Sequence, residues 1–298
     1  MGAFPGPAGH GGRGGAHRGS GGGRGGSGPA GPGGRGGSDR NPGGGRGGPD
    51  GPDLLYGRNP VREVLLGGRR RLRRIWIMEG EAGRRLAAEV SHWAGSAGIW
   101  APVVTLVPAH ELTSRAASPD HQGIVAEADP YPYAEAETAL ENHDLVMALD
   151  RVQDPHNLGA VIRTAHEVGA AIAIPRHRAA TVTPAVVKAS AGATEHATIV
   201  QVRNLTDFIE QAKKAGFWVY GAEADADEAY DGPDYRGPTV FVLGSEGEGL
   251  SDRVAGACDV RVGIPLQGRI GSLNVSVAAA VLLFEAVRQR RRPMEQLT

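Results

Sequence analysis

The chain has little cysteine and no apolar run long enough to cross a bilayer. Cys258 is its only cysteine, so one chain cannot form an internal disulfide, and we expect a reducing, cytoplasmic setting. The longest apolar stretch, residues 275–284, is shorter than a transmembrane helix. The N-terminus also lacks the apolar segment of a secretory signal. We therefore expect no membrane association and no secretory leader.

The usual phosphate-binding glycine motifs are also missing. The loop Gly244-Ser245-Glu246-Gly247-Glu248-Gly249-Leu250 lacks the Lys-Ser/Thr pair of a Walker motif and does not fit G-x-G-x-x-G. It follows a strand-like run at residues 239–243, where ligands of open α/β sheets bind. Because its two carboxylates would repel phosphate, we expect a neutral or cationic ligand.

Glycine is abundant but concentrated at one end. Of the 47 glycines, 25 lie before Pro52, and GGRGG recurs four times with Arg13, Arg24, Arg35 and Arg46 eleven residues apart. Such a segment has almost nothing to bury, so we expect residues 1–52 to be a disordered tail. Arginine spaced by glycine resembles RGG segments that contact RNA, and a purely solubilising tail is the alternative. The tail carries six arginines against two aspartates, so the remainder of this chain of net charge −1 is mildly acidic.

Residues 53–129 predict a small α/β domain. Helix and strand patterns alternate through Asn59–Leu66, Ile75–Met78, Glu81–Ala97, Val103–Val107, Pro108–Ala117 and Gly123–Ala128. Five arginines between Arg69 and Arg74 precede its strand at Ile75 and suggest a phosphate-binding patch. The Pro-containing, acidic segment 130–142 is typical of a linker.

Residues 143–298 predict a second α/β domain. It opens with the continuous apolar run Leu145–Leu149, typical of a strand buried on both faces, and strands then alternate with helices. This pattern indicates a mostly parallel sheet. Asp154 and Pro155 mark a helix start, with Asn157 at its mouth and Arg163 off the apolar stripe. Asn157 is interpretable as a cap, and Arg163 as one member of an exposed i,i+4 pair with Glu167.

The stretch from Val260 to Arg290 combines a strand, a loop and an apolar helix. The loop contains Gly268 and Gly271, and either Ser272 or Asn274 is placed to cap the helix that follows. A buried helix with a capped entrance explains these residues. Glycines followed by polar residues at a helix mouth equally fit the lip of a pocket.

Three blocks together resemble the SpoU-type, or TrmH-like, RNA ribose 2′-O-methyltransferases: DPHNLGAVIRTA, VLGSEGEGLS and IPLQGRIGSLNVSVAAAVLLFEAVR. In addition, YGRNPVREVLL and DHQGIVAEA are similar to the substrate-binding domain of bacterial 23S rRNA guanosine 2′-O-methyltransferases. The resemblance covers roughly residues 54–292. It implies methyl transfer from S-adenosyl-L-methionine to a ribose 2′-hydroxyl of RNA, without a metal.

The resemblance also implies an architecture and a cofactor site. The N-terminal domain would have a ribosomal L30e-like fold. The catalytic domain would be a parallel-sheet SPOUT domain with a C-terminal trefoil knot, working as a homodimer; such knots are otherwise very rare. The positions that match the family's cofactor-binding loops are Gly244, Ile264 and Leu273, with Gly268 beside them.

The implied catalytic surface consists of Asn157, Arg163, Glu246, Ser272 and Asn274. Arg163 matches the family's candidate for activating the hydroxyl. A guanidinium keeps its proton in nearly every protein setting, so binding a phosphate and stabilising the developing alkoxide is the role that suits its charge. Glu246 is a candidate for orienting Arg163, and the remaining three for positioning ribose and phosphate.

Two other functions stay open at this stage. One is a non-catalytic RNA-binding or ribosome-assembly protein with the same fold, although a pure binder has no need of all five polar residues. The other is a tRNA ribose methyltransferase, although the simplest tRNA enzymes of the family lack the N-terminal domain.

Overall fold

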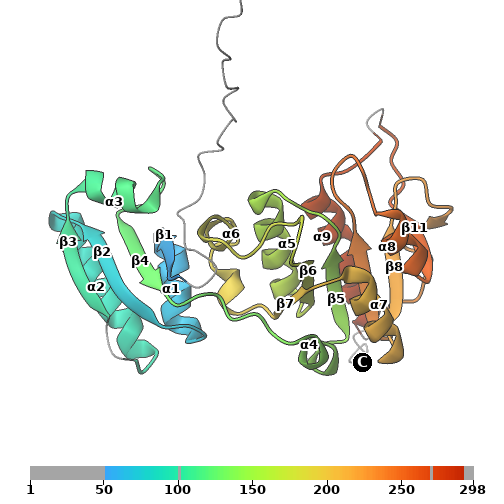
Figure 1. Ribbon diagram of the computed structural model, residues 1–298, viewed down its shortest axis with the longest axis horizontal. Helices are drawn as coiled ribbons and strands as arrows, with labels where there is room; N and C mark the ends of the chain where they lie inside the picture. Colours follow the sequence, from blue (N-terminus) through green and yellow to red (C-terminus); the bar gives the residue numbers. More distant parts are fainter. Residues whose placement is uncertain (1–50, 100–101, 269–270, 292–298) are drawn as a thin grey trace, which may run out of the picture. The chain divides into compact units, whose positions relative to one another are not determined.

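The computed structural model describes residues 51–99, 102–268 and 271–291. Nearly all of the expected tail, with its GGRGG repeats, lies outside these ranges. The described residues contain two sheets, one in each predicted domain (Figure 1).

The first sheet has four strands in the order β1-β4-β2-β3. Strands β2 and β3 are parallel, whereas β4 runs antiparallel to β1 and β2. The elements are β1 (Asp53–Tyr56), α1 (Arg58–Gly67), β2 (Leu72–Met78), α2 (Glu81–Ser96), β3 (Val103–Val107), α3 (Ala109–Ala116) and β4 (Ile124–Ala128). The predicted helices and strands are confirmed. Strand β1, which pairs with β4 at the sheet edge, is an addition to them.

The second sheet has seven strands in the order β7-β6-β5-β10-β8-β11-β9, and every pairing is parallel. Its strands are β5 (Leu145–Leu149), β6 (Ala171–Pro175), β7 (Ile199–Val202), β8 (Trp218–Ala222), β9 (Glu228–Ala229), β10 (Thr239–Leu243) and β11 (Val260–Gly263). The helical elements are α4 (Ala136–Asn142), α5 (Pro155–Glu167), α6 (Pro184–Ala189), η1 (Ala193–Glu195), α7 (Leu205–Lys214), α8 (Asp252–Ala257) and α9 (Val275–Arg290). The prediction of a mostly parallel sheet is confirmed.

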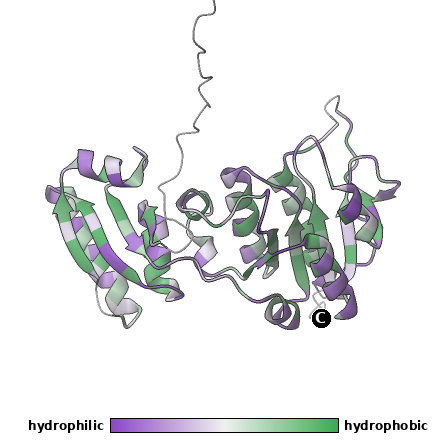
Figure 2. Ribbon diagram, in the orientation of Figure 1, coloured by the Kyte–Doolittle hydropathy of each residue, from purple (hydrophilic) through white to green (hydrophobic). Residues whose placement is uncertain are grey.

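Strand β5 shows why this sheet is covered on both faces. Its alternate residues Leu145, Met147 and Leu149 belong to a core cluster that also includes side chains of α5, α6 and α9. Val146 and Ala148 point to the opposite cluster, which contains residues of α4, α7 and α8. In Figure 2 the strands of this sheet are coloured mostly as hydrophobic. The continuous apolar run therefore marks a central strand buried between two helical layers.

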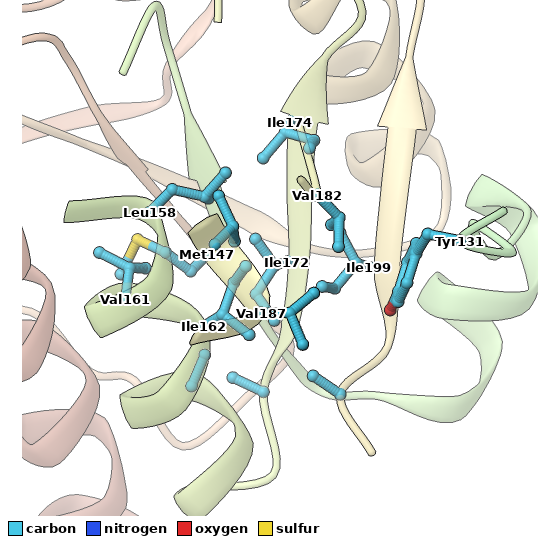
Figure 3. Close-up of a cluster of buried hydrophobic side chains, with 14 of the residues drawn as sticks. Tyr131, Met147, Leu158, Val161, Ile162, Ile172, Ile174, Val182, Val187 and Ile199 are labelled. Carbon is cyan, nitrogen blue, oxygen red and sulfur yellow. The ribbon is translucent and has the colours of Figure 1, made fainter. Parts of the chain in front are cut away.

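Helix α5 packs closely on the sheet and on α6. Leu158, Ile162 and neighbouring residues of α5 face Met147 and Ile172 of the strands (Figure 3). A β-carbon at Gly159 would lie 2.5 Å from the Ala189 β-carbon, which is far too close. A glycine at this position thus lets α5 and α6 approach.

Short polar side chains fix the starts of the two helices that bear site residues. Asp154 caps α5 by accepting from the His156 N–H at 3.0 Å, with Pro155 in the first turn. Asn274, rather than Ser272, caps α9 through a 2.9 Å bond from the Ser276 N–H. Helix α9 then packs on α5 and β10.

The expected linker, residues 130–142, is not featureless. Helix α4 forms its second half and buries Ala139 and Leu140 against the sheet, with contacts to β7. The short elements η1 and β9 also go beyond the prediction. The trefoil knot stays a prediction.

Candidate active site

Two loops meet at the carboxyl edge of the seven-stranded sheet. Because β5 and β10 are paired in parallel with Leu149 opposite Leu243, the segments that follow these strands emerge side by side. Asp150 locks them together, since its buried Oδ2 accepts from the Ser251 N–H at 2.7 Å. The glycine loop is therefore tied at both ends, at the edge where α/β proteins bind ligands.

Three of the predicted catalytic residues form a hydrogen-bonded triangle. Glu246 Oε1 accepts from Asn157 Nδ2 at 3.0 Å and from Asn274 Nδ2 at 2.8 Å. Asn274 Nδ2 also donates to Asn157 Oδ1 at 2.9 Å. These side chains come from α5, the glycine loop and the start of α9, so the structure brings together one residue from each of the three blocks.

Arg163 and Ser272 lie outside this triangle. Arg163 is exposed on α5, and within the described ranges it forms neither an ion pair with Glu167 nor a bond with Glu246. The expected Glu246–Arg163 contact is thus not made within the described residues of the single chain, and Glu246 Oε1 accepts from two asparagine amides instead. Ser272 is exposed on the loop before α9 and lines a cavity.

That cavity, of about 560 Å³, adjoins the triangle, with Glu246 in its wall. Gly244, Ile264 and Leu273, three of the predicted cofactor-binding residues, line it together with Ser272. Gly268 is exposed and is not among the lining residues. We call this space the glycine-loop cavity.

Gly244 is required by the path of the loop that forms the cavity. A β-carbon there would lie 2.0 Å from the Gly249 carbonyl carbon and 2.1 Å from its oxygen. The loop returns on itself, with the Gly249 N–H donating to the Ser245 carbonyl at 3.0 Å. A side chain at residue 244 would force this turn open.

A second cavity, of about 770 Å³, is lined by Asn157 and Glu246 of the triangle. It shares Ser245, Glu246, Glu248 and Val275 with the glycine-loop cavity. Its remaining lining residues are mainly polar: Arg151, Val152, Gln153, Asp154, Asn157, Arg178 and Ala179. We call it the arginine cavity. Glu246 of the triangle therefore lines both spaces.

Sequence reasoning missed Asp150 and Arg151. Asp150 is 5% exposed, and Arg151 donates from Nη1 to Glu248 Oε2 at 2.7 Å. Their position directly after a predicted buried parallel strand could have indicated them, because ligand-binding residues gather at the carboxyl ends of such strands. Their partners lie about a hundred positions further along the chain and could not be found from spacing.

The arginine run of the N-terminal domain is only partly a free patch. Arg70 is buried, forms a bidentate pair with Glu195 at 2.7 and 3.1 Å, and also bonds Asp53 at 2.7 Å. Arg69 donates to the Tyr131 hydroxyl and to backbone carbonyls next to η1. These two arginines stabilise the fold, so the predicted phosphate patch is reduced to the exposed members of the run.

The described residues offer neither a metal site nor a membrane-spanning helix. Among them, no group of three or more His, Cys, Asp or Glu side chains is arranged to hold a metal ion. Nor is any of their helices both long and apolar enough to cross a membrane.

Family comparisons agree with this geometry. The model of the SpoU rRNA Methylase family matches residues 144–284, and a model for RNA 2′-O ribose methyltransferase substrate binding matches residues 54–134. YacO of Bacillus subtilis, assigned to the TrmH family of tRNA/rRNA methyltransferases, is 38% identical over 245 residues. That alignment covers 80% of this chain and 96% of YacO.

Two solved structures with bound cofactor are similar as well. The SpoU methyltransferase AviRb of Streptomyces viridochromogenes in complex with AdoMet superposes with a TM-score of 0.65 at 26% identity, covering 80% of this chain and 90% of AviRb. An AdoMet-bound rRNA methyltransferase of Sinorhizobium meliloti gives 0.66 at 26% identity, covering 81% and 88%.

The glycine-loop cavity suits S-adenosyl-L-methionine. Its wall combines apolar side chains such as Leu250 and Leu266 with the carboxylates of Glu223 and Asp225. This composition matches a ligand that has an adenine ring and a positively charged sulfonium, and no phosphate. Gly244 keeps the floor free of a side chain. The sequence-based expectation of a cationic ligand is thus consistent with the cofactor.

The matches of both domains, the parallel sheet and the fit of the cofactor therefore all indicate the same family. The chain belongs to the SpoU family of RNA 2′-O-ribose methyltransferases and uses S-adenosyl-L-methionine as its cofactor.

Proposed function

We propose that this protein methylates the ribose 2′-hydroxyl of a guanosine in 23S rRNA, in the cytoplasm and as a homodimer. The observation that carries the proposal is the triangle of Asn157, Glu246 and Asn274 on the rim of the glycine-loop cavity. The choice of 23S rRNA is supported by the blocks YGRNPVREVLL and DHQGIVAEA, which lie within the matched substrate-binding domain.

The chemistry asks mainly for alignment. When bound, S-adenosylmethionine supplies a methyl group from its sulfonium, and the sulfur leaves as a neutral thioether because the S–C bond breaks as the new O–C bond forms. The protein must place the ribose oxygen in line with that methyl group and help the hydroxyl to release its proton. Preorganised polar groups suit this task because they need not move during the reaction.

The triangle provides such groups. Glu246 holds both asparagines through one oxygen, which leaves Oε2 without a bond to the triangle and available to a substrate hydroxyl. Ser272 lines the same cavity and is placed to contact the cofactor or the ribose. Arg163 would stabilise the developing alkoxide and the neighbouring phosphate. Its exposed position on α5 supports its acting in the site of a second copy of the chain.

Mapping 2′-O-methylation in RNA from cells with and without the protein tests the substrate. The proposal expects one guanosine of 23S rRNA to lose its methyl group. Loss at a tRNA position instead would make the protein a tRNA methyltransferase. If no position changes and the purified chain fails to bind S-adenosylmethionine, the non-catalytic RNA-binding alternative gains support.

Replacing Arg163 by lysine tests the role assigned to the guanidinium. Lysine keeps the positive charge but loses the planar fork that binds phosphate through two bonds. We expect transfer to slow by about 10²-fold in single-turnover assays, as for loss of one preorganised donor. A near wild-type rate would contradict both the activating and the bidentate role.

A further inference from the structure

The arginine cavity adjoins the glycine-loop cavity, which we assign to the cofactor, and it is large enough for a nucleotide. It has about 770 Å³ of space and reaches the triangle through Asn157 and Glu246. A ribose positioned at the triangle would therefore lie next to this cavity, which has room for part of the RNA strand that continues from it. The charged groups nearest to that ribose are phosphodiesters, because every ribose in RNA is flanked by two of them.

Two arginines line this cavity from separate loops. Arg151 follows β5, and Arg178 lies in the loop between β6 and α6. Both have a left-handed backbone, with φ of 60° and 59°. A residue with a β-carbon adopts this conformation at an energetic cost, and such positions cluster at functional sites. The two loops thus place guanidinium groups at the arginine cavity, although each arginine has an unfavourable backbone conformation.

Arg151 already holds an anion in the absence of RNA. Its Nη1 bonds Glu248 Oε2 at 2.7 Å, while Asp150 lies 3.6 Å from its Nε and Gly249 accepts from Nη2 at 3.3 Å. The Glu248 side chain is 73% exposed, so it is weakly held and free to turn into solvent. Asp150, in contrast, is buried and would keep Arg151 in place after Glu248 leaves.

We propose that Arg151 and Arg178 bind one of the two phosphodiesters that flank the methylated ribose, the other being the one assigned to Arg163, and that Glu248 covers Arg151 until RNA displaces it. This inference rests on the proposed function, because it assigns a subsite to the same RNA substrate. Guanidinium groups are suited to phosphate because they offer paired donors in one plane. The glutamate would lower the affinity for anions other than a correctly placed RNA strand.

The test uses 23S rRNA purified from cells that lack the protein. The variants are Arg151→Ala and Arg178→Ala, with Arg176→Ala as matched control, since Arg176 is exposed in the same loop but does not line the cavity. We expect each cavity variant to raise the Kd for RNA about 10-fold. Each should also reduce the slope of log Kd against log salt concentration by about 0.7–0.9, the value of one lost phosphate contact. Arg176→Ala should change neither quantity.

Glu248→Gln tests the second half of the inference. We expect this change to lower the Kd for RNA several-fold, and to have no such effect in the Arg151→Ala background, where the covered cation is absent. Circular dichroism and the urea unfolding midpoint, measured for every variant, report whether the fold is intact.

The outcomes separate this inference from the proposed function. If the wild type methylates the rRNA but both arginine variants bind it with wild-type affinity and salt dependence, the subsite is wrong and the function stands. If RNA affinity is unchanged and only the maximal rate falls, the arginines act in positioning and the phosphate assignment is again overturned. If the wild type fails to methylate 23S rRNA at all, the proposed function itself fails.

Discussion

At the scale of single residues, Glu246 explains how blocks far apart in sequence become one site. One of its oxygens accepts from two asparagine amides, one on α5 and one that caps α9. The family resemblance implied all three residues as catalytic, whereas their positions at a helix start or in a strand-following loop indicated only helix caps or the edge of a ligand pocket. The sequence could not predict that they bond one another, since those bonds depend on β5 and β10 being neighbours in the sheet.

Replacing Glu246 by glutamine should slow methyl transfer and leave cofactor binding almost unchanged. The amide oxygen can still accept from Asn157 and Asn274, so the triangle keeps its shape, but the charge that would attract the hydroxyl proton is lost. We expect a decrease of about 10²-fold in the single-turnover rate, with the Kd for S-adenosylmethionine measured alongside. An unchanged rate would make Glu246 a structural residue of the loop.

Cys258 should be chemically inert in the folded protein. Its thiol donates to the Val254 carbonyl, and burial raises the pKa of Cys258 from 9.0 to about 12, against a smaller opposing effect of Lys213. The thiol of an unfolded chain ionises near pH 9, so between about pH 9 and 12 the folded state retains a proton that the unfolded state has lost. Stability should therefore fall as pH rises through this window.

Urea unfolding at several pH values checks this expectation. The unfolding midpoint of the wild type should decrease between pH 8 and 10 more than that of Cys258→Ala, which lacks the thiol but keeps the other titrating groups. Ellman's reagent at pH 8 should react slowly with the native protein and rapidly in denaturant. Fast labelling of the native protein would contradict burial of the thiol.

At the scale of helices and strands, the apolar pattern predicted an element correctly where the run of apolar residues was long. Helix α5 was predicted from apolar residues that repeat at helical spacing, and strand β5 from its continuous apolar run. Helix α4 and strand β1 were not, because α4 buries only Ala139 and Leu140, and β1 has just four residues. Elements this short owe their structure to the neighbouring sheet rather than to their own sequence.

Gly159→Ala should loosen the contact between α5 and α6. In an exposed helix this change usually stabilises, because alanine has the higher helix propensity. At Gly159 the new methyl group would meet the Ala189 β-carbon at 2.5 Å and the Ser190 nitrogen at 2.9 Å. We expect a loss of about 1–3 kcal/mol in the free energy of unfolding, as for other overpacked cores.

Gly95→Ala in α2 is the matched control, since a β-carbon there meets nothing within 4 Å. It should leave the free energy of unfolding unchanged or slightly higher. Urea denaturation followed by circular dichroism measures both variants. Equal stability of Gly159→Ala and the wild type would mean that α6 moves away at no cost.

At the scale of the whole molecule, the arginine run shows the limits of reading charge from sequence. Five arginines predict a surface patch, yet Arg70 is buried between Asp53 and Glu195. The pKa of the Asp53 carboxyl is raised, because burial outweighs the lowering effect of its ion pair with Arg70. Glu195 lies 125 positions further along the chain, so its pairing with Arg70 could not be read from a local pattern.

Helix α9 carries an apolar stripe that the other described residues leave uncovered. Val277 and Phe284, seven residues apart, are 48% and 51% exposed and lie on the same side of the helix. Large exposed apolar side chains in a row are typical of protein interfaces. Together with the exposed position of Arg163 on the neighbouring helix α5, this stripe supports the proposed homodimer.

Phe284→Arg should therefore convert a dimer into a monomer that binds S-adenosylmethionine but transfers its methyl group slowly. Light scattering after size exclusion measures the mass. Circular dichroism and urea unfolding of Phe284→Arg show whether the monomer keeps its fold. A monomeric wild type would contradict the proposal outright.

Mixing two inactive variants tests whether the copies share sites. If Arg163 of one copy completes the triangle of the other, Arg163→Ala and Glu246→Gln subunits together form heterodimers in which one site has both residues. After subunit exchange, the activity should then rise clearly above that of either variant alone. If both residues serve the same copy, every site lacks one of them and mixing restores nothing, so the exposed position of Arg163 would need a different explanation.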